Sequence, residues 1–152
     1  MTFAAFAIGF FAGLRSLTPP ALVAWAAALG WLNIEGFLSF MGSTPAVAIF
    51  TLLAIAELVA DKLPQTPART APIGLVARLA SGALCGACIA AATGQSTIFG
   101  SGIAEIGAVA GTFGGYQARR RLTAGGSVPD VAVAMLEDLV AVFGSLWVVT
   151  RG

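Results

Sequence analysis

Long apolar runs, each opened by a hydroxyl residue and a proline, give the chain its pattern. Proline is favoured in the first turn of a helix, where its missing N–H costs no hydrogen bond, and a preceding Ser or Thr can cap that turn. The pattern predicts helices over 19–32, 45–63, 72–93 and 129–149. A further apolar run over 101–118 adds one more helix, so the sequence predicts an all-α protein.

The first apolar stretch, 3–14, is too short to cross a bilayer alone. At 1.5 Å per residue it reaches only about 20 Å, whereas the hydrocarbon core is about 30 Å thick. The segment Leu14-Arg15-Ser16-Leu17-Thr18-Pro19-Pro20 separates it from the next run. Residues 3–32 are therefore predicted to form one broken element. It is either a kinked single span or a re-entrant hairpin, and the sequence does not decide between them.

Composition places these runs in a membrane. Of the 152 residues, 58% are hydrophobic and 10% are charged, whereas a soluble domain has about 25% charged residues. The mean hydropathy is +0.92. We therefore expect a single integral membrane domain over 1–152, a helical bundle of about five spans with a broken first helix. The net charge of +1 gives no indication of nucleic acid binding.

Catalytic and cofactor motifs are missing from the sequence. There is no His, no phosphate-binding loop and no dinucleotide fingerprint, so we expect neither an enzyme nor a cofactor. The pair Cys85-Gly-Ala-Cys88 lies in an apolar run without a second pair to complete a metal site. Helix packing is the favoured interpretation of these cysteines, with soft-metal transport or redox chemistry as the alternative, and we expect no metal site.

Basic residues are unevenly distributed among the connections. Segments 62–72 and 119–128 hold most of the Lys and Arg, whereas 33–44 and 94–100 hold none. The positive-inside rule then places 62–72 and 119–128 on the cytoplasmic side of the plasma (inner) membrane. With 3–32 as one span, the N-terminus is cytoplasmic, and a re-entrant first element would place it outside.

Several charged residues fall within the predicted spans, where each costs about 2.5–3.5 kcal/mol on insertion scales. They are Arg15, Glu57, Arg78, Glu137 and Asp138, with Asp61 and Glu105 nearer the ends of spans. One hypothesis is a polar site for a charged solute or lipid headgroup near the membrane midplane. The other is a set of ion pairs, with Arg15 and Arg78 bound to Glu57 and Glu137, that only fix the packing of the helices.

The break at 14–20 is the predicted binding site. A half-helix that starts at Thr18 would direct free N–H groups and the positive end of its dipole at the break, next to Arg15. We expect Arg15, Thr18, Arg78 and Ser81 to contact an anion. Glu57, Asp61, Glu137 and Asp138 would be coupling acids or counter-ions.

Two short sequence patterns occur twice in the chain and favour a transporter. The order of an arginine helix followed by an acidic helix occurs twice, at Arg15 and Glu57 and again at Arg78 and Glu137. Transporters are often built from inverted repeats with interrupted helices. This predicts a weak internal repeat, with chance similarity as the alternative.

Glycines at four-residue spacing predict close helix packing. The pairs Gly9/Gly13 and Gly82/Gly86 fit this spacing, and Gly107, Gly111 and Gly115 extend it to a double repeat. Packing is the main interpretation and a pore-lining stripe the alternative. A homo-oligomer contact through Gly107, Gly111 and Gly115 is a further expectation.

Four elements in a fixed order carry a resemblance to a known family. They are Gly13-Leu-Arg15-Ser-Leu-Thr18-Pro19, Glu57-Leu-Val-Ala-Asp61-Lys62-Leu-Pro64, Arg78 before Ser81-Gly82-Ala83, and Glu137-Asp138. The chain from about residue 9 to 145 resembles domain-of-unknown-function family 4126, a family of small bacterial membrane proteins. The resemblance implies a shared membrane architecture and nothing about a substrate.

These observations lead to one expected function and one alternative. We expect a small transporter or channel for a charged solute or lipid headgroup, in contact with membrane lipids. The alternative is a non-transporting scaffold or assembly factor whose buried charges only lock the fold. A cavity that touches both Arg15 and Arg78 would favour the transporter, and a closed charge cluster would favour the scaffold.

Overall fold

The computed structural model describes residues 1–63 and 71–151, and every regular element in these two ranges is helical. The elements are α1 (Thr2–Leu14), α2 (Thr18–Ala28), η1 (Gly36–Gly42), α3 (Thr44–Ala60), α4 (Pro72–Ala92), α5 (Thr97–Ala124) and α6 (Asp130–Arg151). The all-α prediction is confirmed.

The proline-marked helix starts lie where the sequence predicts them. The hydroxyl of Ser43 accepts a hydrogen bond of 3.3 Å from the N–H of Ala46 at the start of α3. Helix α4 begins at Pro72, and α2 begins at Thr18 with two prolines in its first turn. The sequence missed the 3₁₀ helix η1. It also predicted α5 too short, because the hydroxyl of Ser96 caps an earlier start.

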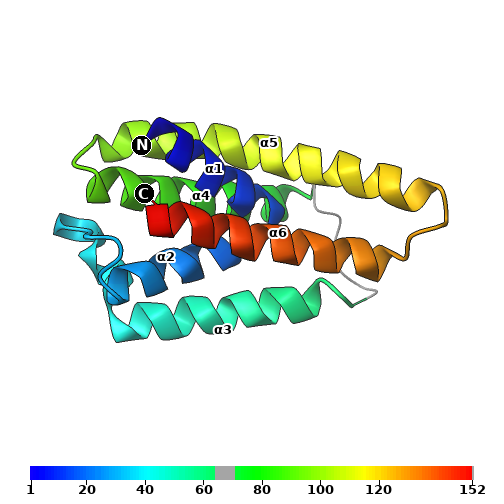
Figure 1. The fold of residues 1–152 in the computed structure, drawn as a ribbon, viewed down its shortest axis with the longest axis horizontal. Helices are drawn as coiled ribbons and strands as arrows, with labels where there is room; N and C mark the ends of the chain where they lie inside the picture. The colour runs from blue at the N-terminus through cyan, green and yellow to red at the C-terminus, as the bar shows by residue number, and fades with distance from the viewer. Residues whose placement is uncertain (64–70, 152) are drawn as a thin grey trace.

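Helices α1 and α2 run in opposite directions and form a hairpin (Figure 1). Along α1, Phe3 packs against Trp147 and Arg15 pairs with Asp138, so α1 is antiparallel to α6. Along α2, Leu17 lies next to Glu57 and the indole of Trp25 donates to Thr51, so α2 is antiparallel to α3. The break at 15–17 therefore reverses the chain, which favours the hairpin alternative over a kinked single span.

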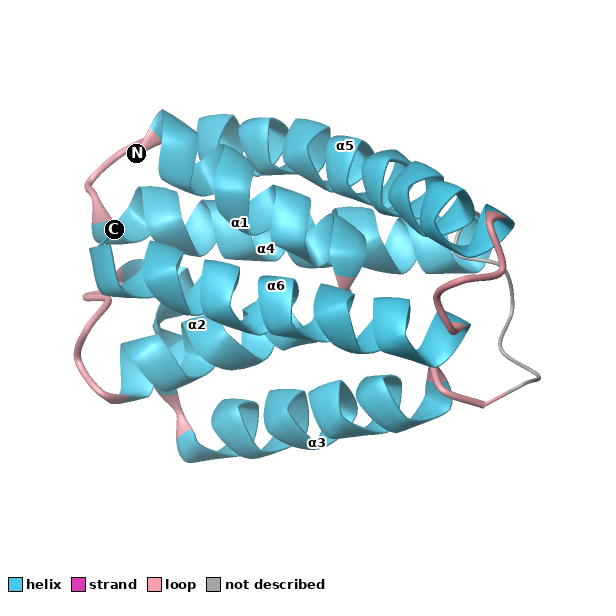
Figure 2. Ribbon diagram, turned by 45° about the vertical axis from the view of Figure 1, so that its right-hand side comes forward, coloured by secondary structure: helices cyan, strands magenta, loops and turns pink. Residues whose placement is uncertain are grey.

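Helices α3 to α6 lie side by side along the long axis of the molecule (Figures 1 and 2). Both termini, the turn after α2 and the connection between α4 and α5 lie at one end. The connection between α5 and α6 and the C-terminal end of α3 lie at the other. We call the latter the basic end, because it contains Lys62 and the three arginines at 119–121. The two basic connections thus share one end, as the sequence predicts, although residues 64–70 of the first lie outside the described ranges.

Two described helices, α4 and α6, are long and apolar enough to cross a membrane. The number rises to three if η1 and α3, which are bent by 62° at their junction, form one span. Helix α1 is apolar but short. Length and composition therefore support association with a membrane through two or three helices and do not confirm five spans.

Glycines allow α1 to pack directly on the backbone of α5. A Cβ atom at Gly107 would overlap the carbonyl oxygen of Phe6, and one at Gly111 would overlap that of Phe10. Gly107, Gly111 and Gly115 are all buried within this chain. The packing prediction is confirmed for this face. The structure gives no support to a homo-oligomer contact there, because α1 already covers Gly107 and Gly111.

The two arginine segments that suggested an internal repeat have different structures. The chain reverses direction immediately after Arg15, whereas α4 continues without a break through Arg78 and Ser81. The predicted repeat is therefore not supported. The similarity between the two segments is confined to short runs of common residues.

Candidate functional site at the hairpin tip

Arg15 occupies the tip of the α1–α2 hairpin and is almost completely buried, with 1% of its surface exposed. Its Nη1 atom lies 2.5 Å from Oδ2 of Asp61, at the end of α3. Its Nη2 atom pairs with Oδ1 of Asp138 on α6. A buried arginine between two carboxylates is electrostatically compensated. Arg15 therefore joins the hairpin tip to both α3 and α6.

Two further cations extend these ion pairs towards the basic end. Nζ of Lys62 lies 3.0 Å from Oδ2 of Asp138. Nη1 of Arg119 lies 3.8 Å from Oδ2 of Asp61 and 3.7 Å from Oε2 of Glu137. Alternating charges therefore run continuously from the buried tip to the molecular surface.

Arg119 also connects α5 to the start of α6. Its Nε atom donates to Oδ1 of Asp130 at 2.6 Å, and its Nη2 atom donates to Oδ2 at 2.5 Å. Such bidentate contacts between a guanidinium and a carboxylate are strong and directional. The hydrogen bonds with Asp130 raise the pKa of Arg119 above its usual value. We refer to Arg15, Asp61, Lys62, Arg119, Asp130, Glu137 and Asp138 as the ion-pair cluster.

Glu57 has a different role, because its carboxylate accepts hydrogen bonds from the two residues directly before α2. Oε1 accepts hydrogen bonds from the N–H of Ser16 at 2.9 Å and from its hydroxyl at 2.5 Å. Oε2 accepts one from the N–H of Leu17 at 2.8 Å. The negative charge lies at the positive end of the α2 dipole, where anions are stabilised. At the break, where the sequence predicts that an anion binds, the N–H groups of Ser16 and Leu17 donate to the side chain of Glu57.

The predicted pairing of Arg15 with Glu57 is therefore wrong. Arg15 pairs with Asp61 and Asp138 instead. The prediction failed because Glu57 and Asp61 lie one helical turn apart on α3, where both come close to the break. The N–H groups of Ser16 and Leu17 donate to Glu57, which leaves Asp61 to pair with Arg15.

Ser81 places the hairpin tip half-way along α4. Its hydroxyl donates to the carbonyl oxygen of Ser16, and it is the tenth of the 21 residues of α4. Arg78 lies almost one turn earlier in α4 and is buried as well. Thr18 is buried at the start of α2, where its Oγ1 atom has no hydrogen-bond partner within the described ranges. Ser81 therefore contacts the tip directly. Arg78 lies three residues before Ser81 in α4, and Thr18 directly follows Leu17 of the break.

Three residues of the ion-pair cluster were not predicted as site residues from the sequence. Lys62 and Arg119 contributed to the positive-inside argument, and Asp130 was not singled out. Lys62 directly follows Asp61, which was a usable signal. Arg119 and Asp130 are eleven residues apart across a turn, and only the helix directions bring them together.

A cavity of about 140 Å³ opens from the basic end onto the ion-pair cluster. Its lining residues are Asp61, Lys62, Leu63, Arg119, Asp130, Val131 and Ala134. The cavity reaches Asp61, whose carboxylate binds Arg15, but neither Arg15 nor Arg78 lines it. The cluster is thus open to the basic end on one side and closed around Arg15 on the other.

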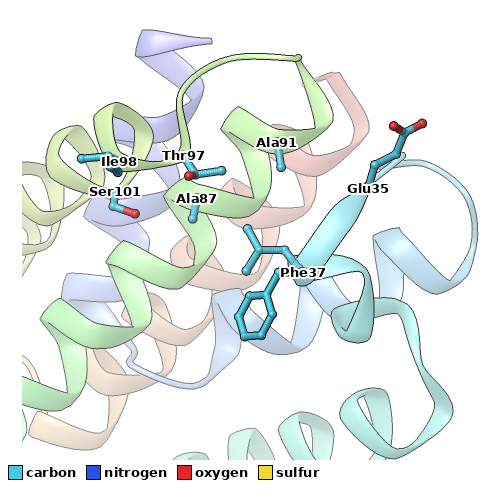
Figure 3. A pocket seen from close by; sticks show the side chains of 8 residues that line it. Glu35, Phe37, Ala87, Ala91, Thr97, Ile98 and Ser101 are labelled. Carbon is cyan, nitrogen blue, oxygen red and sulfur yellow. The ribbon is translucent and has the colours of Figure 1, made fainter.

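A second cavity, of about 270 Å³, lies near the opposite end of the molecule, between η1, α4 and α5 (Figure 3). Apolar side chains such as Phe37 and Ile98 form most of its wall. Glu35 lies at its edge with the carboxylate turned away from the other side chains (Figure 3). This cavity is separate from the hairpin tip and has no charged group directed into it.

The cysteine pair does not take part in the site. Cys85 and Cys88 are buried in α4 and are not joined by a disulfide. Over the described ranges, no group of three His, Cys, Asp or Glu residues is arranged to hold a metal ion. Both thiols pack in the hydrophobic core instead.

The comparisons with known proteins identify the family. No curated protein and no solved structure matches the chain. The family model described as "Domain of unknown function (DUF4126)" matches residues 2–150, which is nearly the whole chain. The resemblance that the sequence motifs suggested is thereby confirmed, and the chain belongs to the DUF4126 family.

Proposed function

We propose that the protein is a membrane transporter for a small anionic solute or an anionic lipid headgroup, which binds at the tip of the α1–α2 hairpin. The observation that carries this proposal is the set of three hydrogen bonds that Ser16 and Leu17, directly before α2, donate to the carboxylate of Glu57. These donors form a complete anion-binding position. Arg15 directly precedes these donors in the chain and supplies a positive charge at the same hairpin tip.

The proposed membrane topology surrounds this position with four spans. In this arrangement α3, α4, α5 and α6 cross the bilayer, and the α1–α2 hairpin enters from the end that holds both termini. In this arrangement the hairpin tip would lie near the midplane, because it contacts Ser81, which lies half-way along α4. Interrupted helices that meet at the midplane form the binding sites of many transporters. The basic end would face the cytoplasm of the inner membrane.

Glu57 would act as a resident anion that the solute replaces. Protonation of its carboxylate removes the negative charge and weakens its hold on the N–H groups of Ser16 and Leu17. A solute carboxylate or phosphate could then accept the same hydrogen bonds. Binding of the anion would thus be coupled to uptake of a proton, and the positive end of the α2 dipole would remain neutralised throughout the cycle.

Asp61 and Asp138 would keep Arg15 compensated while the position changes occupant. Both carboxylates contact its guanidinium, so the arginine does not depend on the solute for its counter-charge. The cavity at the basic end reaches Asp61 and would be the path to the cytoplasm. Opening that path to the tip requires Arg119 to release Asp61 or Glu137.

Flux measurements in liposomes test this proposal. Purified protein is reconstituted, and uptake of acetate, lactate, phosphate and glycerol phosphate is compared with that of uncharged glycerol. We expect flux of one anion class that a pH gradient drives. Glu57→Gln should abolish the dependence on the pH gradient, whereas Glu105→Gln, a change at an exposed position on α5, should preserve it. Equal flux of anions and glycerol would contradict the proposal.

A structural scaffold is the second candidate, and one observation favours it. Arg15 is buried and already paired with two carboxylates, and the cavity at the basic end stops short of it. A chain that only holds a fixed shape in the membrane needs no more than this. Absence of flux for every anion in the panel, from protein that is folded and correctly inserted, would support the scaffold.

A further inference from the structure

A separate cavity of about 300 Å³ lies beside the C-terminal part of α5 at the basic end. Its lining residues are Tyr116, Arg119, Arg120, Thr123 and Asp130. Four of the five come from one face of α5, at spacings of three and four residues that bring side chains together. The cavity is outside the hairpin tip, and the proposed transport cycle does not use Tyr116, Arg120 or Thr123.

The net charge of this cavity comes from Arg120. The charges of Arg119 and Asp130 neutralise each other through their bidentate contact. Arg120 is exposed, and no carboxylate pairs with it in the described part of the chain. The phenol of Tyr116 and the hydroxyl of Thr123 add neutral polar groups to the same wall. An anion with several acceptor oxygens, such as a phosphate ester, matches this combination.

An apolar stripe leads from the cavity along the outer surface of α5. Ile106, Val109 and Phe113 are exposed large side chains, spaced three and four residues apart. They continue the row that Tyr116 and Arg120 complete, because one helix face repeats at this spacing. A tyrosine followed by an arginine at the end of an apolar stripe is typical of the boundary between the bilayer core and the headgroups.

We propose that this face of α5 binds one anionic phospholipid. Its phosphate lies in the cavity against Arg120 and Tyr116, and its acyl chains lie along Ile106, Val109 and Phe113. The stripe distinguishes this ligand from a soluble phosphate, which would need only the polar cavity. The inference does not depend on transport, because a scaffold would bind the same lipid.

Lipid retention measured by native mass spectrometry tests the proposal. Purified protein is exchanged into mixed micelles that contain phosphatidylglycerol or phosphatidylcholine with identical acyl chains. We expect one phosphatidylglycerol molecule to be retained on each chain and phosphatidylcholine to be retained weakly. A single basic residue near an anionic lipid changes binding by about fivefold, so Arg120→Gln should weaken retention of phosphatidylglycerol by about that factor.

Arg121→Gln is the matched control, because it removes the same charge from the adjacent exposed position, which does not line the cavity. It should leave retention unchanged. An equal loss in both variants, or equal retention of the two lipids, would overturn the proposal in favour of general electrostatic attraction. Displacement of phosphatidylglycerol by an equal concentration of inorganic phosphate would overturn it in favour of a soluble anion. Melting temperatures of both variants confirm that they are folded.

Discussion

Arg15 at the tip of the α1–α2 hairpin and Asp138 on α6 form a buried ion pair that joins the hairpin to the last helix. Asp61 at the end of α3 completes the arrangement from the other side. Three elements that are distant in the sequence are thus held at one point by a single guanidinium. The stability of the hairpin and the chemistry of its tip therefore depend on the same residue.

Replacement of this guanidinium should destabilise the fold strongly. Arg15→Ala leaves Asp61 and Asp138 without their buried counter-charge, and breaking such a pair from one side typically costs about 3–5 kcal/mol. We expect a much lower melting temperature in detergent, measured by size-exclusion chromatography after heating. Arg121→Ala, at an exposed position, should melt like the parent chain.

A compensating change separates charge from packing. Arg15→Ala combined with Asp138→Asn should recover part of the lost stability, because one of the two carboxylates that lose Arg15 is then neutral. A double variant that is no more stable than Arg15→Ala would show that the loss comes from packing around the tip and not from charge.

Glu57→Gln should weaken the start of α2 while leaving the size of the side chain unchanged. An amide offers one acceptor oxygen and one donor group, so it cannot accept from both the Ser16 and the Leu17 N–H groups. Loss of a charged cap at a helix N-terminus costs about 0.5–2 kcal/mol. Hydrogen exchange of the α2 amides should become faster, whereas Glu105→Gln on α5 should leave it unaltered.

Two glycines on α5 should respond oppositely to the same substitution. Gly111→Ala places a methyl group against the backbone of Phe10, where only rigid atoms are present, and should displace α1 and lower the melting temperature. Gly114→Ala meets open space and replaces the residue that disfavours helix by about 1 kcal/mol relative to Ala. It should be neutral or stabilising. Equal destabilisation in both variants would contradict the packing of α1 on α5.

The hairpin can be tested by labelling single cysteines with a membrane-impermeant reagent. Cysteines introduced at the exposed positions Thr2, Asn33 and Gln95 should react from one side of the membrane, and one at Ser127 from the other. The native thiols are buried and should stay unlabelled. If 3–32 were a single kinked span, Thr2 and Asn33 would react from opposite sides.

Local signals in the sequence predicted the helix boundaries well. Helices α3 and α4 begin at Thr44 and Pro72 because proline and its preceding residues act within one turn, and the break after Leu14 follows from the same chemistry. The extent of α5 was predicted less well. Its last turns carry polar and basic residues, Arg119 among them, which hydropathy excludes although they remain helical.

The partners of the charged residues could not be predicted in the same way. Which carboxylate pairs with Arg15 depends on the direction of α2 and on the depth of its first turn, and both are set by packing between distant elements. Of the acids that the sequence singled out, Glu57, Asp61 and Asp138 contact residues 15–17. The sequence did not predict that the N–H groups of Ser16 and Leu17 would donate to Glu57. Arg15 therefore pairs with Asp61 and Asp138 instead.

The wide separation of Arg15 from its partners along the chain has a consequence for biosynthesis. Ribosomes add about 5–20 residues per second, so the segment between residues 15 and 138 takes on the order of ten seconds to make. During that interval the nascent hairpin has an arginine and no Asp138. Asp61 is made earlier and can pair with the guanidinium, whereas its second carboxylate partner arrives only with α6. The hairpin tip therefore completes its ion pairs only when α6 is present, and ribosome-stalled chains that stop before α6 should leave the hairpin more accessible to proteases.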